Sequence, residues 1–94
     1  MIYSIPYFIL RFELLFGEIG GSAFSTNDMG WIFWPGDTFS ERYDLAKLFE
    51  RHCGSVADTA TRTGTMFDLG KSGYMPCERI ISALKWMQEQ EEAA

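Results

Sequence analysis

One histidine and two cysteines are the residues in this chain best suited to metal binding or nucleophilic chemistry. His52 and Cys53 are adjacent, and Cys77 follows far downstream. A structural zinc site needs four ligands, usually in spaced pairs, and adjacent residues on a helix point about 100° apart. We therefore expect no metal and no cofactor. We expect a buried, inert thiol at Cys77 and a helix-end position for His52.

Two catalytic alternatives carry less weight. Cys77 follows Pro76 at a predicted helix start, where a thiolate is stabilised, but it would need a base and His52 belongs to another predicted helix. A thiol-dependent enzyme is thus a lesser alternative. Gly70-Lys71-Ser72 resembles the end of a phosphate-binding loop, but Gly64 is one residue too far away. The aspartates considered for acid–base catalysis are Asp37, Asp44, Asp58 and Asp68, and none of them lies in an apolar context that demands a shifted pKa.

The charge balance bears on the class of partner. The formal net charge is −5, and the eight basic residues are scattered along the chain. Direct nucleic-acid binding needs clustered Lys and Arg, so it is disfavoured. A protein partner with a basic surface is favoured, because opposite fields speed encounter and suppress wrong partners. The alternative is that the charge only keeps a small domain in solution.

The run Trp31-Ile32-Phe33-Trp34 is the most informative for binding. Aromatic residues make up 16% of the 94-residue chain, and so small a core does not have room for every ring. As a strand, this run places Trp31 and Phe33 on one face and Trp34 on the other. If helices cover one face, rings remain for a partner, with acidic residues beside them. The predicted contact residues are Trp31, Phe33, Trp34, Asp37, Glu41 and Asp44. The alternative is that both faces are buried.

Residues 7–16 are predicted to form a strand. Phe8, Phe12 and Phe16 fall at alternate positions together with two leucines, and Arg11 and Glu13 lie between them. A helix is the competing prediction, because Phe8, Phe12 and residues 15 and 19 would also align, and Pro6 could start it. Residues 22–26 and 31–34 are predicted to form a hairpin, and residues 59–69 an exposed edge strand.

Two helices are predicted. The first is capped by Ser40, with an apolar stripe made by Leu45, Leu48, Phe49 and His52, Asp44 facing solvent and Gly54 at its end. The second starts near Pro76, with a stripe made by Cys77, Ile80, Ile81, Leu84 and Met87. Residues 88–94 form an acidic tail that we expect to fray, because carboxylates oppose the negative end of a helix dipole.

These elements predict one α+β domain over residues 1–94, with a small antiparallel sheet of three or four strands and two helices packed on one face. The expected order is β-β-β-α-β-α. The apolar N-terminus lacks the basic region of a signal peptide and is too short and too charged to span a bilayer, so we expect a cytoplasmic protein that does not bind membranes. Cys53 and Cys77 would then be reduced, and would pair only in an oxidising compartment.

The predicted function is a non-catalytic protein-binding domain. It would be a small acidic inhibitor that docks on the basic surface of a partner such as a nucleic-acid-binding complex, as anti-CRISPR or toxin-immunity proteins do; size and charge alone support this. Such an inhibitor presents carboxylates where phosphates would lie. The alternative is a structural subunit or homodimer that uses its surplus aromatic residues as an obligate interface.

Overall fold

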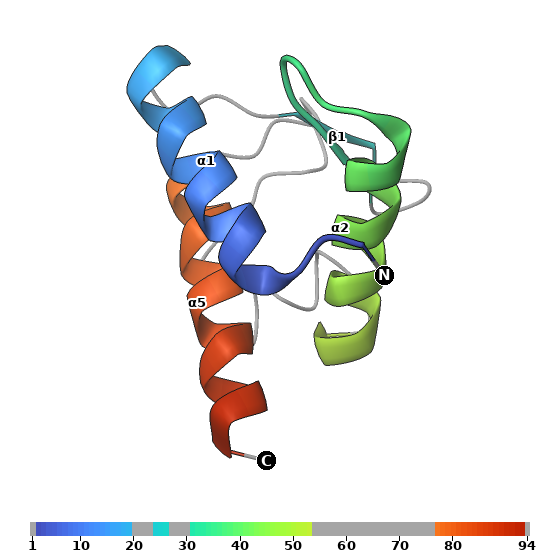
Figure 1. The fold of residues 1–94 in the computed structure, drawn as a ribbon, viewed down its shortest axis with the longest axis vertical. Helices are drawn as coiled ribbons and strands as arrows, with labels where there is room; N and C mark the ends of the chain where they lie inside the picture. Colours follow the sequence, from blue (N-terminus) through green and yellow to red (C-terminus); the bar gives the residue numbers. More distant parts are fainter. Residues whose placement is uncertain (1, 20–23, 27–30, 54–76, 94) are drawn as a thin grey trace.

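Three α-helices dominate the part of the chain that the structure describes, which is residues 2–19, 24–26, 31–53 and 77–93. Residues 19, 24–26, 31 and 53 are described by their backbone alone. In this computed structural model (Figure 1), the elements in chain order are α1 (Ile5–Ile19), β1 (Phe24–Thr26), β2 (Trp31–Phe33), α2 (Phe39–Cys53) and α5 (Cys77–Ala93).

The predicted α+β fold with a sheet of three or four strands is wrong. The described residues contain only the antiparallel pair of β1 and β2, in which Phe24 lies opposite Phe33 and Thr26 lies opposite Trp31. Both strands fall within the ranges predicted for the hairpin. The edge strand predicted over residues 59–69 and the turn at residues 70–72 lie outside the described residues. The described elements follow the order α-β-β-α-α in place of the predicted order.

The largest error concerns residues 7–16, which belong to helix α1 and not to a strand. Ile5, Phe8, Phe12 and Leu15 are buried at helical spacing along one side of α1. Pro6 lies in the first helical turn, where its missing N–H costs no hydrogen bond. Most residues of α1 are apolar, so the sequence satisfies a period of two and a period of 3.6 at once. The buried residues of α1 follow the period of 3.6, so packing against the core selects the helix over the strand.

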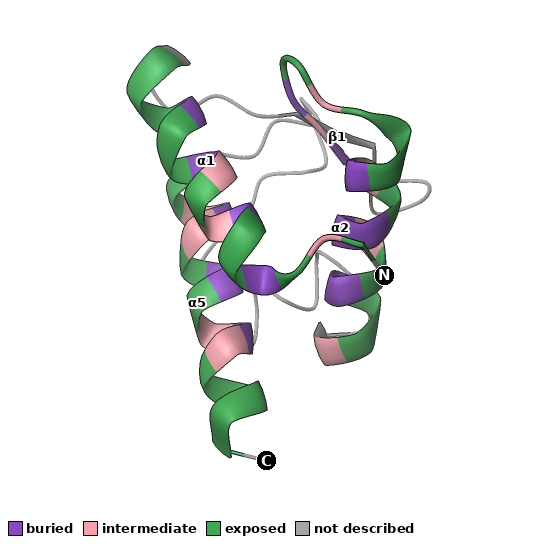
Figure 2. Cartoon of the chain, viewed as in Figure 1, coloured by how far each residue is buried: buried purple, intermediate pink, exposed green. Residues whose placement is uncertain are grey.

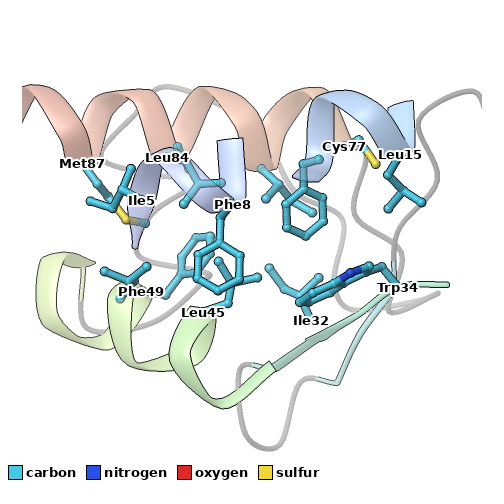
Figure 3. Close-up of a cluster of buried hydrophobic side chains, with 14 residues drawn as sticks. Ile5, Phe8, Leu15, Ile32, Trp34, Leu45, Phe49, Cys77, Leu84 and Met87 are labelled. Atoms are coloured by element: carbon cyan, nitrogen blue, oxygen red, sulfur yellow. The ribbon is translucent and has the colours of Figure 1, made fainter. Parts of the chain in front are cut away.

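The core lies between two layers. Helices α1 and α5 pack against each other and run in opposite directions, and together they form one layer (Figure 1). Helix α2 and strand β2 form the other layer, and Figure 3 shows the buried side chains filling the space between the two. The buried positions of α1 and α2 lie on the sides of these helices that face each other (Figure 2). The core residues are Ile5, Phe8, Phe12, Leu15, Ile32, Trp34, Leu45, Leu48, Phe49, Cys77, Ile80, Ala83, Leu84 and Met87.

The apolar stripes predicted for the two later helices are largely confirmed. Leu45, Leu48 and Phe49 of α2 are buried, and so are four of the five stripe residues of α5. Ile81 is half-buried at the edge of the core. The predicted cap at residue 54 lies outside the described residues.

The predicted N-cap of α2, Ser40, is wrong, because Ser40 already lies in the first turn. Thr38 caps the helix: its Oγ1 accepts a hydrogen bond from the Glu41 N–H at 3.2 Å, and Glu41 Oε1 accepts one from the Thr38 N–H at 3.0 Å. This reciprocal pair is a capping box. It follows a turn in which the Asp37 N–H donates to the Trp34 carbonyl at 3.2 Å and Gly36 has a φ of 79°. This positive φ at the third position of the turn is typical of a type II turn, which favours glycine there.

The tail predicted to fray is helical as far as Ala93. Glu91 joins the end of α5 to the end of α2, because its Oε2 lies 2.8 Å from His52 Nε2 and 3.5 Å from Arg51 Nη1. These contacts bring the guanidinium group of Arg51 and the imidazole ring of His52 to the acidic end of α5. They offset part of the unfavourable interaction between its carboxylates and the helix dipole.

Candidate functional site

Of the two predicted contact aromatics whose side chains the structure describes, Phe33 and Trp34, the second is the more deeply buried. Its side chain is 3% exposed, and its ring centroid lies 4.9 Å from that of Phe12 and 6.5 Å from that of Phe8. Phe33 is half-buried beneath the guanidinium group of Arg42, which lies 5.0 Å from the ring centroid. The side chain of Trp31 lies outside the described residues. Trp34 therefore serves the core, and Phe33 has little free surface.

The predicted acidic residue Asp37 is committed to local structure. Its Oδ2 accepts a hydrogen bond from the Trp34 N–H at 3.1 Å, and its Oδ1 forms an ion pair with Arg42 Nη1 at 3.0 Å. The side chain of Asp37 is 12% exposed. Asp37 thus holds the chain between β2 and α2 in place, with most of its surface covered.

Glu41 is buried and joins α1 to α2. Its Oε2 accepts a hydrogen bond from the Tyr7 hydroxyl at 2.6 Å and lies 3.6 Å from Arg11 Nε. Burial alone would raise the pKa of Glu41, but hydrogen bonds from Tyr7 and Thr38 and the charge of Arg11 outweigh it and lower the pKa. The same hydrogen bond raises the pKa of Tyr7 to about 12, with burial as the second cause. This cluster therefore favours a carboxylate and a neutral phenol.

Asp44 was predicted to face solvent, and this is wrong. The residue is 6% exposed, and its Oδ2 accepts hydrogen bonds of 2.9 Å from the backbone N–H groups of Ile2 and Tyr3. A buried carboxylate is stable where such donors satisfy it. The Asp44 side chain holds the segment before α1 against α2. Asp37, Glu41 and Asp44 are thus used inside the fold and offer a partner little surface.

Among the described residues, four of the seven exposed large hydrophobic side chains lie on α1. Leu10 is 58% exposed, Leu14 56%, Phe16 41% and Tyr7 36%. Leu10 and Leu14 are one helical turn apart, on the side of α1 that faces away from its buried stripe. The predicted site did not include these residues, because a strand over residues 7–16 places Leu10, Leu14 and Phe16 on the same face as Phe8 and Phe12. Helical spacing places Leu10 and Leu14 on a different side of the helix from Phe8 and Phe12, and this difference is the signal that could have identified the exposed residues.

A shallow, open groove lies between α1 and α5, with a volume of about 410 Å³. Among the described residues it is lined by Phe16 and Ile81, which are apolar, and by the carboxylates Glu13 and Glu78. Lys85 Nζ lies 3.8 Å from Glu13 Oε2, and both side chains are about half exposed. We call two separate parts of this surface together the α1–α5 face: the outer side of α1 at Leu10 and Leu14, and this groove, whose Phe16 lies about 160° around the helix from Leu14.

The thiol and the histidine do not form a catalytic pair. Cys77 is a completely buried thiol, not half of a disulfide, and burial followed by the charge of Glu78 raises its pKa to about 11. His52 contacts Glu91, which lies about 20 Å along α5 from Cys77 at 1.5 Å per residue. A buried thiol with a raised pKa, far from the histidine, is a poor nucleophile. Within the described ranges, no cluster of three or more His, Cys, Asp or Glu side chains could hold a metal ion.

Comparison with models of protein families, with curated proteins and with solved structures found no match. No helix in the described part of the chain has both the length and the apolar character that crossing a membrane requires.

Proposed function

We propose that this chain is a non-catalytic protein-binding domain whose contact surface is the α1–α5 face. The observation that carries this proposal is the exposure of Leu10 and Leu14, each more than half exposed on a helix whose other side is fully buried. A helix at the surface of a globular protein usually carries polar residues on the side away from the core, so two exposed leucines on that side favour a further contact. Exposed apolar side chains beside polar residues are typical of interaction sites.

The partner that fits this face is a protein with a basic surface. Glu13 and Glu78 lie beside the apolar side chains of the groove, and the chain carries a net charge of −5. An apolar centre next to carboxylates matches a partner that presents apolar side chains flanked by Lys or Arg. The surface differs from the one predicted from the sequence, but the chemistry of the partner is the same.

The narrower proposal is that the domain acts in the cytoplasm as a small inhibitor, covering the basic surface of a partner such as a nucleic-acid-binding complex. Its small size and acidic balance support this. The thiol character of Cys77 is compatible with a reducing compartment. In this arrangement Glu13 and Glu78, and not the buried Glu41 and Asp44, would compete with phosphate groups for the partner's cations.

Site-specific photo-crosslinking tests the proposed surface. A photo-reactive phenylalanine analogue replaces Leu14 in one variant and Phe39, an exposed aromatic residue of α2 (61%), in a control variant. Expressed in the native host, the Leu14 variant should form one dominant adduct with a protein that has a basic contact region. Adducts from the Phe39 position alone, or equal adducts from both, would refute the α1–α5 face as the contact surface.

A second candidate is a homodimer formed through α1. Tyr7, Leu10 and Leu14 carry no charge, so two copies of this stripe can meet without repulsion between like charges. Three side chains cover little of the roughly 800 Å² per partner that stable interfaces bury, and the homodimer therefore ranks second. Sedimentation of the wild type and of Leu14→Lys separates the candidates: a dimer that the substitution dissociates supports the homodimer, and a wild-type monomer excludes it.

A further inference from the structure

The groove between α1 and α5 has the composition of a peptide-binding site. Its described lining combines an aromatic ring and a branched aliphatic side chain, Phe16 and Ile81, with the carboxylates of Glu13 and Glu78. Small ligands are usually held in concave pockets that bury most of their surface. A groove that is shallow and open is better suited to one side of an extended or helical segment.

The charges of the groove restrict its occupant. Glu13 pairs with Lys85 at 3.8 Å, but both side chains are about half exposed, and exposed pairs of this kind contribute little. Glu13 can therefore exchange this partner for another cation. Glu78, in the first turn of α5, is exposed as well. Nucleic acids and anionic lipid surfaces would be repelled by these carboxylates, whereas Lys or Arg side chains would be attracted.

The geometry favours a helix as the occupant. Helices α1 and α5 lie side by side in opposite directions (Figure 1). The groove is lined by about one turn of each helix, at Glu13 and Phe16 of α1 and at Glu78 and Ile81 of α5. Two neighbouring helices leave a furrow into which the side chains of a third helix pack, as ridges fit into grooves. Amphipathic helices are commonly recognised in this way, through apolar anchors at helical spacing.

We propose that the α1–α5 groove binds a basic amphipathic helix of the partner protein. An apolar anchor of that helix contacts Phe16 and Ile81, and Lys or Arg side chains on its flanks pair with Glu13 and Glu78. This proposal rests on the proposed function and adds the kind of segment that the partner presents.

Binding of synthetic peptides, measured by calorimetry, tests the proposal. One probe is a helical peptide of about four turns with leucines at helical spacing and lysines elsewhere. The second keeps the leucines and replaces every lysine by glutamate. We expect the lysine peptide to bind and the glutamate peptide not to bind. Absence of binding by the lysine peptide would overturn the proposal.

A pair of variants with equal net charge separates the groove from general electrostatic attraction. Glu13→Lys with Glu78→Lys reverses the groove, and Glu50→Lys with Glu92→Lys reverses two exposed carboxylates outside it; circular dichroism verifies that both variants are folded. The first pair should weaken binding by about tenfold or more, and the second should leave it within about twofold. Equal weakening by both pairs would overturn the proposal.

The two proposals fail in different ways. If the lysine peptide does not bind but the Leu14 photo-crosslink still captures a basic partner, the basic-helix assignment is wrong and the proposed function stands. If the crosslink also forms no adduct, both are wrong.

Discussion

The hydroxyl group of Tyr7 donates a hydrogen bond of 2.6 Å to the carboxylate of Glu41, and this bond connects α1 to the first turn of α2. The same carboxylate completes the capping box with Thr38 and lies 3.6 Å from Arg11 Nε. One buried acidic residue therefore starts a helix and fixes its position against another. Because these contacts bury the carboxylate of Glu41, a binding partner cannot reach it.

The Tyr7 hydroxyl predicts a loss of stability at alkaline pH. Its pKa in the folded state, about 12, is above the ordinary value of 10.0. The unfolded chain therefore loses this proton first, and the stability contributed by the neutral phenol is complete below pH 10 and decreases as the pH rises toward 12. Urea unfolding of Tyr7→Phe should show a smaller decrease over this range than the wild type, and a stability lower by about 1 kcal/mol at neutral pH. Tyr43→Phe is the control, and an alkaline decrease unchanged in Tyr7→Phe would show that this account of Tyr7 is wrong.

The capping box predicts different effects for two neighbouring hydroxyl residues. Thr38→Ala removes the acceptor for the Glu41 N–H and should lower the free energy of unfolding by about 1 kcal/mol. Ser40→Ala should change it by less than about 0.5 kcal/mol, because Ser40 is exposed within the first turn. Thermal and urea unfolding measure both values. A larger loss from Ser40→Ala would restore Ser40 as the cap and contradict the structure.

Two glycines should respond in opposite directions to replacement by alanine. Gly36 has a φ of 79°, so Gly36→Ala is strained and should cost about 1–2 kcal/mol. Gly17 lies within α1, and a Cβ there would meet nothing within 4 Å. Gly17→Ala should therefore stabilise the fold by about 0.5–1 kcal/mol through helix propensity. Urea unfolding of the two variants checks the signs, and a stabilised Gly36→Ala would argue against the turn described before α2.

The sequence predicted helix α2 and helix α5 well, because their apolar residues recur every three or four positions and polar residues occupy the positions between them. Leu45, Leu48 and Phe49 have charged neighbours that no strand pattern explains. Helix α1 has no such contrast: its few charged residues leave Phe8, Leu10 and Phe12 compatible with either period. The local signals for the helix, at Pro6 and at the spacing of Phe8 and Phe12, compete with those for a strand, and burial of one side of α1 in the core decides between them.

Four of the predicted binding residues offer a partner little surface, for a related reason: Trp34, Asp37, Glu41 and Asp44. Local spacing gives the face of an element but not the donors that approach it from elsewhere in the chain. Asp44 can be buried because the N–H groups of Ile2 and Tyr3 donate to it from 42 and 41 residues away. Glu41 was predictable in part, since Thr38 and Glu41 have the spacing of a capping box. The exposure of Leu10 and Leu14 follows only once α1 is known to be a helix.

Side-chain footprinting of the chain bound to its native partner tests the central claim most directly. Hydroxyl radicals label exposed Leu, Phe and Tyr side chains, and the chain exposes such residues both on α1 (Leu10, Leu14 and Phe16) and on α2 (Phe39 and Tyr43). We predict that binding reduces the labelling of Leu10, Leu14 and Phe16 and leaves that of Phe39 and Tyr43 unchanged. Protection confined to Phe39 and Tyr43 would contradict the account, because it would place the partner on α2.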